Sequence, residues 1–600
     1  MTAMTGQGLA AWQQYIRQHS DDLISLLEAY AGSLSTEDNA WIAIASATQI
    51  RDQLEPLLTQ YQQTPDALPL FGIPFAVKDN IDVAGWPTTA ACPAFAYLAE
   101  RDAFAVAKLK AAGAIVIGKT NLDQFATGLV GTRSPYGAVS NTFQADYVSG
   151  GSSSGSASVV ARGLVPFALG TDTAGSGRVP AAFNNIVGLK PTKGWLSAQG
   201  VVPACRLNDT LSVFALTAED AFYITSLAAG YDAGDAYSRV HPATAPAAIP
   251  QNPVFAIPAT LTFFDDVQAQ AAWEQALAAL RESGATLKPI DFSAFTRLAE
   301  QLYQGPWVAE RTAAVGAMLN TPEKMDPIVH GIIAGGLTFS AVEAFQAEYL
   351  RAELAQQINA ALREVDALVV PTSPTIHTID EMKQEPVRFN SQFGTYTNFT
   401  NLADLAALAL PGPFRADGLP AGITLIAPAW HDRALADFGV RWQQQLALPR
   451  GATGLAFTPS ATALPVSAQH VRVAVVGAHL RGMPLNFQLV SRQAVFVETT
   501  QTAACYRLYA LANTQPQKPG LARADEGTAI EVELWDIPLA RFGEFVAEIP
   551  PPLGIGTLEL RDGRLVKGFI CEPAALSDAT DITAFAGWRN WIARKETRHV

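Results

Sequence analysis

The sequence predicts a large α/β domain in residues 1–445 and a smaller α+β, β-rich domain in residues 469–600. Three observations support this. A chain of 600 residues is too long for a single compact core. Apolar strands alternate with helical patterns through the first part of the chain. A segment rich in proline and small residues, 446–468, then separates this part from a series of short strands, and we interpret it as a linker.

The first 65 residues are predicted to be helical, because apolar residues recur at helical spacing through 8–31 and again through 38–62. A short apolar strand follows in 70–85 and runs into the polar turn of PFAVKDN. Residues 103–126 then predict a helix, a buried strand, a loop and a second helix.

The rest of the α/β domain continues the same alternation. Residues 148–202 are rich in glycine and serine, with a helix expected at 154–164. We expect a strand–helix–strand unit at 252–290 and a long helical region at 293–365. Two buried strands are expected at 366–374 and 418–428.

The smaller domain is predicted from short apolar runs separated by turn residues. These runs and the helix expected after them lie at 471–480, 494–511, 529–538, 553–573 and 580–595. The segment 469–600 that contains them has the length of a small domain, which suits a module that folds independently of the first domain.

The composition excludes several classes of protein. Hydrophobic residues make up 49% and charged residues 16%, which is typical of a globular chain, and the net charge of -14 argues against nucleic acid or a membrane surface as the main partner. The four cysteines are scattered and form no CxxC pair, so we expect neither a disulfide framework nor a metal site. With no signal peptide or membrane span visible, we expect a cytoplasmic protein.

One serine stands in a setting that suits a nucleophile. Ser176 lies between two glycines in LGTDTAGSGRVP, but no histidine occurs between His19 and His241 to act as its base. Lys78 ends an apolar strand, where burial lowers a lysine pKa and allows the neutral form to serve as a base. The alternative is that Lys78 pairs with Asp79 or Asp82.

Two glycine-rich segments could form the rest of such a site. The segment GGSSSGSAS, 150–158, is either a flexible linker or a loop that shapes a site, and the apolar segments on both sides favour the loop. In TDTAGSG, successive backbone N–H groups can converge on an anion. Beside a nucleophile, this arrangement would be an oxyanion hole.

Together these segments resemble the amidase signature family. PFAVKDN stands upstream of GGSSSGSASVVARGLVPFALGTDTAGSGRVP, and the likeness extends over roughly residues 20–445, including GKTNLDQFATG, DALVVPTSP and GLPAGITLIAP. The resemblance implies a mixed central sheet covered by helices on both faces. It also implies a Ser–Ser–Lys relay in which Ser176 is the nucleophile, Ser152 the bridging serine and Lys78 the base.

The resemblance also assigns the groups around the relay. The backbone N–H groups of Thr173, Ala174, Gly175 and Ser176 would form the oxyanion hole, where one donor is worth about 3 to 4 kcal/mol of barrier. Asp172 and Arg178, which flank the turn, are expected to shape the loop rather than take part in the chemistry. Ser153 and Ser154 are expected to support the loop, and Ser153 could tune the relay.

The C-terminal module resembles the C-terminal domain of allophanate hydrolases in VRVAVVGAHLRGMPLN and TLELRDGRLVKGFICEP, and NLDQFATGLVGTRSPYG resembles the same subfamily. This resemblance implies that Tyr303 and Arg311 recognise the substrate and that Gly128 lies near its urea end. Eight residues of continuous helix would place Tyr303 and Arg311 on one face, although Gly305 and Pro306 interrupt the pattern. The alternative is an exposed tyrosine and an arginine paired with Glu310 or a neighbour.

The resemblance implies hydrolysis of allophanate to ammonia and N-carboxycarbamate, which yields carbon dioxide and a second ammonia, without a cofactor. The alternatives are an amidase for malonamate or a ureide, the glutaminase component of a tRNA-dependent amidotransferase, and an inactive scaffold. His479 is either an acid or base in a second site that decarboxylates the first product, or a structural residue.

The family also implies a homodimer and a source of allophanate. The chain shows no biotin-attachment motif, so we expect urea carboxylase to be a separate protein. A cyanuric acid and biuret pathway is an equal alternative as the source.

Overall fold

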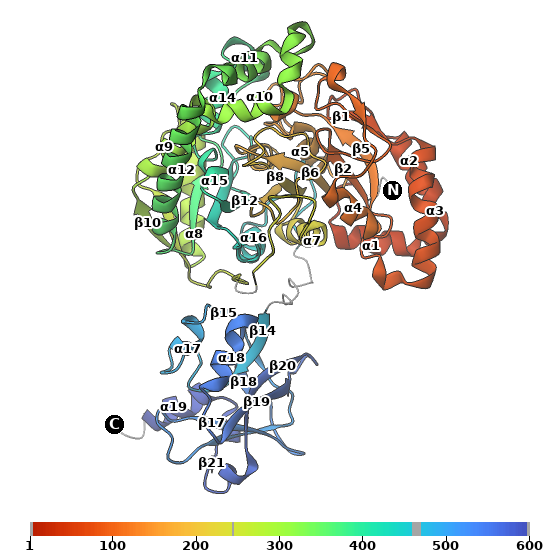
Figure 1. Ribbon diagram of the computed structural model, residues 1–600. Coiled ribbons are helices and arrows are strands. Elements are labelled where there is room, and N and C mark those ends of the chain that lie inside the picture. The colour runs from red at the N-terminus through yellow and green to blue at the C-terminus, as the bar shows by residue number, and fades with distance from the viewer. Residues whose placement is uncertain (1–3, 243–244, 459–469, 597–600) are drawn as a thin grey trace. The chain divides into compact units, whose positions relative to one another are not determined.

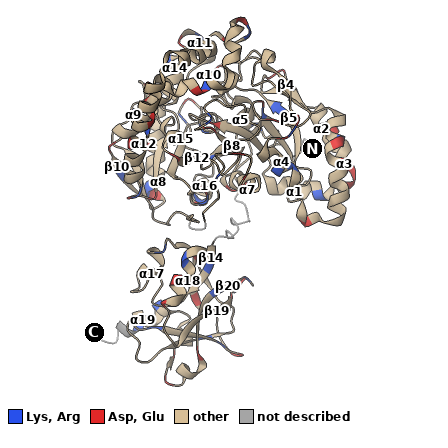
Figure 2. Ribbon diagram, viewed as in Figure 1, with Lys and Arg blue, Asp and Glu red and all other residues tan. Residues whose placement is uncertain are grey.

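The structure is a computed structural model that describes residues 4–242, 245–458 and 470–596 (Figure 1). The chain divides into two compact units. The first comprises Met1–Val240 and Asn252–Ala461, and the second comprises His241–Gln251 and Thr462–Val600. The predicted linker at 446–468 lies partly outside the described residues, because 459–469 are not among them. Acidic and basic residues are interspersed along the chain of both units (Figure 2).

The first unit is built on an eleven-stranded mixed sheet, which confirms the predicted α/β class. Helices surround this sheet in Figure 1. In spatial order its strands are β1 (Trp41–Ile44), β5 (Ile115–Thr120), β2 (Pro74–Lys78), β6 (Phe167–Asp172), β8 (Thr210–Ala215), β7 (Val187–Lys190), β12 (Leu405–Pro411), β13 (Gly422–Pro428), β11 (Ala367–Pro371), β9 (Val254–Pro258) and β10 (Thr286–Ile290).

The direction of three central strands brings distant parts of the sequence together. Strand β2 is parallel to both β5 and β6, with Val77 opposite Leu169 in the β6 register. Parallel strands end at the same edge of a sheet, so Lys78 at the end of β2 and Asp172 at the end of β6 reach one edge. Every residue of β2 and β6 is buried, as expected for strands covered on both faces.

Helix α5 (Ser154–Ala161) follows the glycine- and serine-rich loop and packs against β6 and β2. The predicted helix at 154–164 is thereby confirmed. All of its residues are buried, although half are serine or glycine, because small side chains allow the helix to approach the sheet closely. A side-chain carbon added at Gly155 would lie 2.2 Å from the backbone oxygen of Ala40.

Two predictions of helix before residue 130 are wrong. Residues Trp41–Ile44 form the edge strand β1, antiparallel to β5, instead of continuing a helix. Helix α3 (Ala47–Gln63) starts only after this strand, because Ser46 and Gln49 form a capping box. Residues Gln124–Ala126 form a short 3-10 turn rather than the predicted helix, with Phe125 at a positive φ. The other N-terminal helices are α1 (Leu9–Gln18) and α2 (Leu23–Gly32).

The predicted helical region at 293–365 is present but broken. Its main helices are α9 (Ser293–Gln304), α10 (Ala309–Val315), α11 (Pro327–Gly335) and α12 (Ala341–Leu362). Helix α9 ends at Gly305, and the 3-10 turn Pro306–Val308 (η6) precedes α10. Among the residues described, no single helix has the length and apolar character to cross a membrane; the bent pair Pro327–Thr338 and Ala341–Leu362 meets that test only jointly.

The second unit is β-rich, as predicted. Its main sheet has the order β15 (Val495–Gln501), β18 (Glu531–Pro538), β14 (His470–Val475), β20 (Leu565–Cys571) and β19 (Leu553–Glu559). A smaller sheet consists of β17 (Pro519–Arg523), β16 (Tyr506–Ala510) and β21 (Thr580–Asp581). Helices α17 (Phe487–Val490), α18 (Leu539–Ala547) and α19 (Trp588–Glu596) complete this unit, and a core around Val473, Leu534 and Phe545 holds it together.

Candidate active site

Lys78 is fully buried at the end of β2 and is linked to the predicted bridging serine. Its Nζ donates to Ser152 Oγ at 2.8 Å and to Thr171 Oγ1 at 2.7 Å. The alternative pairing with Asp79 or Asp82 is wrong. Asp79 pairs with Lys119 at 3.0 Å, while Asp82 accepts hydrogen bonds from two other side chains.

The surroundings of Lys78 favour its neutral form. Burial lowers the pKa of Lys78 from its ordinary value to about 7. The negative charges of Asp123, Asp209 and Asp172 oppose this shift, and the positive charge of Arg311 adds to it. A lysine with a pKa near 7 can accept a proton at neutral pH and return it later, as a general base and acid must.

Ser152 lies in an ordered loop, so the flexible-linker interpretation of 150–158 is wrong. Its side chain is fully buried, and the Gly151–Ser152 peptide is cis. The next residue, Ser153, donates from its hydroxyl to the Thr171 carbonyl and accepts from the Thr171 N–H. The backbone oxygen of Ser152 accepts from the N–H of Asp123. The Ser153 bonds tie the serine loop to the end of β6, as expected for Ser153, and the Ser152 bond ties it to the segment after β5.

The turn that carries Ser176 is held by a buried ion pair. Arg178 donates to both carboxylate oxygens of Asp172 at 2.9 Å, and both side chains are fully buried. The N–H of Gly177 also donates to Asp172. The predicted structural role of Asp172 and Arg178 is confirmed. Gly175 has a φ of +143°, which a residue with a side chain rarely adopts.

The same turn carries the candidate oxyanion hole. Within the described ranges, the backbone N–H groups of Ala174, Gly175 and Ser176 have no acceptor, so they remain available to an anion. Thr173 begins the turn, and its hydroxyl donates to Asp209. The structure therefore brings the four predicted oxyanion-hole residues together in one buried turn.

One link of the predicted relay is absent from this structure. The Ser176 side chain is buried, at 3% exposure, but among the described residues its hydroxyl has no hydrogen-bond partner, Ser152 included. Lys78 is thus joined to Ser152, whereas Ser152 is not joined to Ser176. Catalytic hydrogen bonds are often long without substrate and shorten in the reacting complex.

Tyr303 and Arg311 meet although they stand on different helices. Arg311 on α10 is 3% exposed and donates through Nη2 to the hydroxyl of Tyr303 on α9 at 3.3 Å. Its Nη1 donates to Thr127 Oγ1 at 2.9 Å. The alternative pairing with Glu310 is wrong, since Glu310 accepts from the Leu207 N–H. No carboxylate within the described chain pairs with Arg311, so a buried cation faces neutral partners only.

Gly128 lies directly after the threonine that contacts Arg311. It has a φ of +154°, and a side-chain carbon there would lie 2.8 Å from Asp123 Oδ2. Glycine is therefore required both by conformation and by space. This position is next to the Arg311 contact, and the role of Gly128 toward a substrate stays a prediction.

The sequence reasoning missed three residues that hold the site. Thr171 accepts from Lys78, Asp123 accepts from the backbone N–H groups of Val130 and Gly131, and Asp209 accepts from Thr173. Thr171 lies within the quoted glycine-rich motif and could have been found there. Asp209 stands between two ordinary segments, and only the fold places it beside the turn.

His479 lies in the second unit, far along the sequence from the relay. Its Nε2 bonds to Gln488 Oε1 at 2.8 Å, and its ring stacks on Phe569. The ring lines a cavity of about 160 Å³ together with Lys518 and Glu548. Burial lowers the pKa of His479, so the neutral imidazole is favoured.

Comparison with known proteins gives two family matches. Residues 24–436 match the Amidase family, and residues 471–593 match the Allophanate hydrolase C-terminal domain. A urea amidolyase of Saccharomyces cerevisiae is 44% identical over 99% of this chain and 34% of its own length. A urea amidolyase of Lachancea kluyveri is 45% identical over 96% of this chain and 32% of its own length. The chain thus spans about a third of the length of these curated relatives.

A solved structure matches over the whole length of both chains. The allophanate hydrolase of Kluyveromyces lactis is 44% identical, with a TM-score of 0.84 over 98% of this chain and 100% of that one. The match to the Amidase family covers more than half of the chain, and the second match covers most of the C-terminal unit. The chain therefore belongs to the amidase family and carries an allophanate hydrolase C-terminal domain.

Proposed function

We propose that this chain is an allophanate hydrolase, a C–N bond hydrolase that acts through Ser176, Ser152 and Lys78. The observation that carries the proposal is the buried Arg311, which has no carboxylate partner within the described chain. An uncompensated buried cation is costly, so a site built around one suits an anionic substrate. Allophanate, a carboxylated urea, offers that carboxylate together with a terminal amide.

The first half of the reaction needs only groups of this chain. Neutral Lys78 takes a proton from Ser152, and Ser152 takes one from Ser176. The Ser176 oxygen then attacks the terminal amide carbonyl of allophanate. The backbone N–H groups of the 173–176 turn stabilise the oxyanion. When the C–N bond breaks, the relay returns the proton to the departing ammonia.

The second half releases the product. The acyl-enzyme is an ester between the Ser176 oxygen and the carbonyl carbon of N-carboxycarbamate. Water attacks this carbonyl and gives its proton to the relay, and the Ser176 oxygen leaves and takes a proton back. N-carboxycarbamate is freed, and its decomposition yields carbon dioxide and a second ammonia.

A planar guanidinium explains why the pocket would select a carboxylate. Arg311 can bind both oxygens of one carboxylate, and Tyr303 and Thr127 hold its plane in place. A neutral amide would leave this buried cation unpaired, which discriminates strongly against neutral analogues.

A second candidate is the glutaminase component of a tRNA-dependent amidotransferase. The matching component of the glutamyl-tRNA(Gln) amidotransferase of Symbiobacterium thermophilum is 35% identical over 63% of this chain and 83% of its own length. The C-terminal unit favours the first candidate, because its match is to the allophanate hydrolase C-terminal domain. Malonamate and ureides are alternative substrates for the same relay.

Ammonia release by the purified chain tests the proposal. The substrates are allophanate, malonamate, biuret, glutamine and a neutral aryl amide, and Ser176→Ala is the control. We expect fast release from allophanate that the control loses. Release from glutamine or the aryl amide, without release from allophanate, would contradict the proposal and leave only the amidase relay.

We also propose that the second unit decarboxylates N-carboxycarbamate, with His479 as base and then acid: its neutral imidazole takes a proton from water and passes it to the nitrogen of the product. In that step the bond between nitrogen and one carboxylate carbon breaks, carbon dioxide leaves, and the nitrogen takes a proton. The His479 cavity supports this role, because Lys518 lies in its wall and can pair with an anion. His479→Gln should keep the first ammonia release unchanged and slow the release of carbon dioxide. Equal rates of carbon dioxide release in both proteins would indicate a structural histidine.

Three other expectations stay predictions. A urea carboxylase, or a cyanuric acid and biuret pathway, would supply the substrate. A homodimer, implied by the family resemblance, and a cytoplasmic location are the further expectations.

A further inference from the structure

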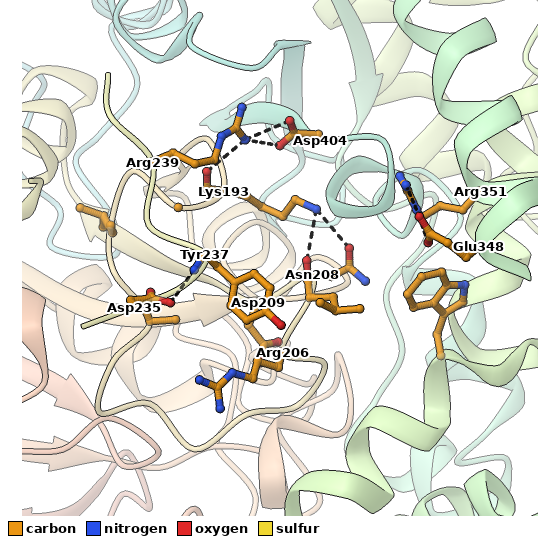
Figure 3. Close-up of a pocket in the computed structure, with 15 residues that line it drawn as sticks. Lys193, Arg206, Asn208, Asp209, Asp235, Tyr237, Arg239, Glu348, Arg351 and Asp404 are labelled. Atoms are coloured by element: carbon orange, nitrogen blue, oxygen red, sulfur yellow. Dashed lines mark hydrogen bonds and ion pairs between the residues drawn. The ribbon is translucent and has the colours of Figure 1, made fainter. Parts of the chain in front are cut away.

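A cavity of about 390 Å³ lies in the first unit apart from the relay, and we call it the side pocket (Figure 3). Its lining comes from the 193–198 and 206–209 segments between β7 and β8, from the 235–239 segment, from η6 and α12, and from Asp404 just before β12. None of Ser176, Ser152, Lys78 and Arg311 lines it. Its volume falls within the range of small-molecule sites, about 300–1,000 Å³.

Two carboxylates of the side pocket are neutralised by arginines. Asp404 accepts from Arg239 at 2.9 Å, and Glu348 accepts from Arg351 at 2.6 Å. Figure 3 shows both pairs at the wall of the pocket. The guanidinium groups of Arg239 and Arg351 are therefore already paired with carboxylates of the protein.

The other two carboxylates accept from neutral donors. Asp235 accepts from the Ser197 hydroxyl and the Ala198 N–H. Asp209 accepts from the Thr173 hydroxyl and from two backbone N–H groups of the 203–209 loop. Their oxygens are occupied by donors that belong to the fold, so these carboxylates need no cation.

Two cations remain without a carboxylate. Lys193 donates only to neutral oxygens, the Leu207 carbonyl at 3.2 Å and Asn208 Oδ1 at 3.4 Å. Arg206 is exposed, and its guanidinium lies 5.8 Å from the centre of the Tyr237 ring. Neither forms an ion pair with any residue in the described ranges. Burial lowers the pKa of Lys193, a shift that a bound anion would oppose.

We propose that the side pocket is a second ligand site, separate from the relay, that binds a small organic carboxylate through Lys193 and Arg206. The flanking Tyr237 ring and the apolar side chain of Leu207 give the pocket walls that suit an organic anion better than a fully hydrated inorganic one. The inference does not depend on which amide the relay hydrolyses.

Two residues of the side-pocket wall contact the neighbours of Ser176 and Arg311. Asp209 lines the pocket and also accepts from Thr173, the first residue of the oxyanion turn. Leu207 lines the pocket and donates its N–H to Glu310, which precedes Arg311. A ligand in the side pocket would therefore touch the 203–209 loop. This loop in turn contacts Thr173 in the oxyanion turn and Glu310 beside Arg311.

Calorimetric titration of the full chain with malonate tests the proposal. The titration uses the Arg311→Gln variant, because this change removes the guanidinium that is proposed to bind the substrate carboxylate near Ser176. We expect this variant to bind one equivalent of malonate. Adding Lys193→Met and Arg206→Gln should abolish the binding, whereas the matched surface changes Lys288→Met and Arg297→Gln should preserve it. Thermal unfolding checks that each variant is folded.

Two results would overturn the proposal. One is that the Arg311→Gln chain binds no malonate, or that it still binds one equivalent after both cations are removed. The other is displacement of malonate by phosphate at equal concentration, which indicates an unselective anion site. If a combined variant does not fold, Arg206→Gln alone serves, because Arg206 is exposed; it should weaken malonate binding at least fivefold. If the unaltered chain does not hydrolyse allophanate, the proposed function is refuted, but the malonate titration still tests the side pocket.

Discussion

Asp209 binds the hydroxyl of Thr173 and so connects the 203–209 loop to the turn that carries Ser176. The carboxylate also accepts from the N–H groups of Ala204 and Cys205, which fixes its own position. Its negative charge reaches Lys78, whose pKa it raises against the effect of burial. One residue outside the sequence motifs thus acts on both the turn that carries Ser176 and Lys78, the proposed base.

We expect Asp209→Asn to lower kcat/KM and to move its pH dependence. Weakening a hydrogen bond to a charged group costs about 1.5 to 3 kcal/mol, so a decrease of roughly tenfold or more is expected. Without the negative charge the pKa of Lys78 falls, and the rise of kcat/KM with pH shifts to lower pH. Asp66→Asn, at an exposed position, is the control. A lower rate with an unshifted pH profile would show that Asp209 is only structural.

The pH dependence of kcat/KM should report Lys78 directly. The base must be neutral, and its pKa is lowered to about 7, so activity should rise as pH increases through about 7 and level off above it. Lys78→Met should lower the rate by roughly 10²- to 10⁴-fold and remove this limb. Rate measurements across pH at saturating and limiting substrate provide the check. A rise of kcat/KM only near the ordinary pKa of lysine would contradict the proposal that Lys78 is the base.

Arg311→Gln should weaken use of the anionic substrate more than the chemical step. Charge-assisted hydrogen bonds are worth about 1.5 to 3 kcal/mol, so kcat/KM for allophanate should fall roughly 10- to 100-fold, mainly through KM. Steady-state kinetics on allophanate and on a neutral amide separate the two effects. Arg297→Gln, on the exposed part of α9, should change neither. An equal loss on both substrates would exclude carboxylate recognition by Arg311.

Arg178→Met should destabilise the first unit. Removing one partner of a buried pair leaves Asp172 as an unpaired buried charge, which typically costs about 3 to 5 kcal/mol. Urea unfolding followed by tryptophan fluorescence measures the loss. Arg51→Met, which breaks a surface pair with Glu28, should cost less than about 1 kcal/mol. Similar losses in the two variants would contradict the structural role of the Asp172–Arg178 pair.

The sequence predicted the fold best where local patterns are strong. Apolar runs that were predicted to be strands become the buried strands β2, β5 and β11, because strands covered on both faces favour apolar residues. It was wrong at Trp41–Ile44, which continues a helical pattern but pairs with β5 as an edge strand. Such a short apolar run suits either structure, and the partner strand decides between them.

The sequence by itself determined which chemical groups the candidate site contains, since PFAVKDN, GGSSSGSAS and TDTAGSGRVP supply Lys78, Ser152 and Ser176 and resemble the amidase signature motifs. Only the tertiary structure decided their environment. The parallel pairing of β2 with β6 buries Lys78 against Thr171, and burial depends on residues far away in the sequence. The same holds for Tyr303 and Arg311. A glycine and a proline break the helix between them, and packing of separate helices restores the contact that sequence spacing alone could not establish.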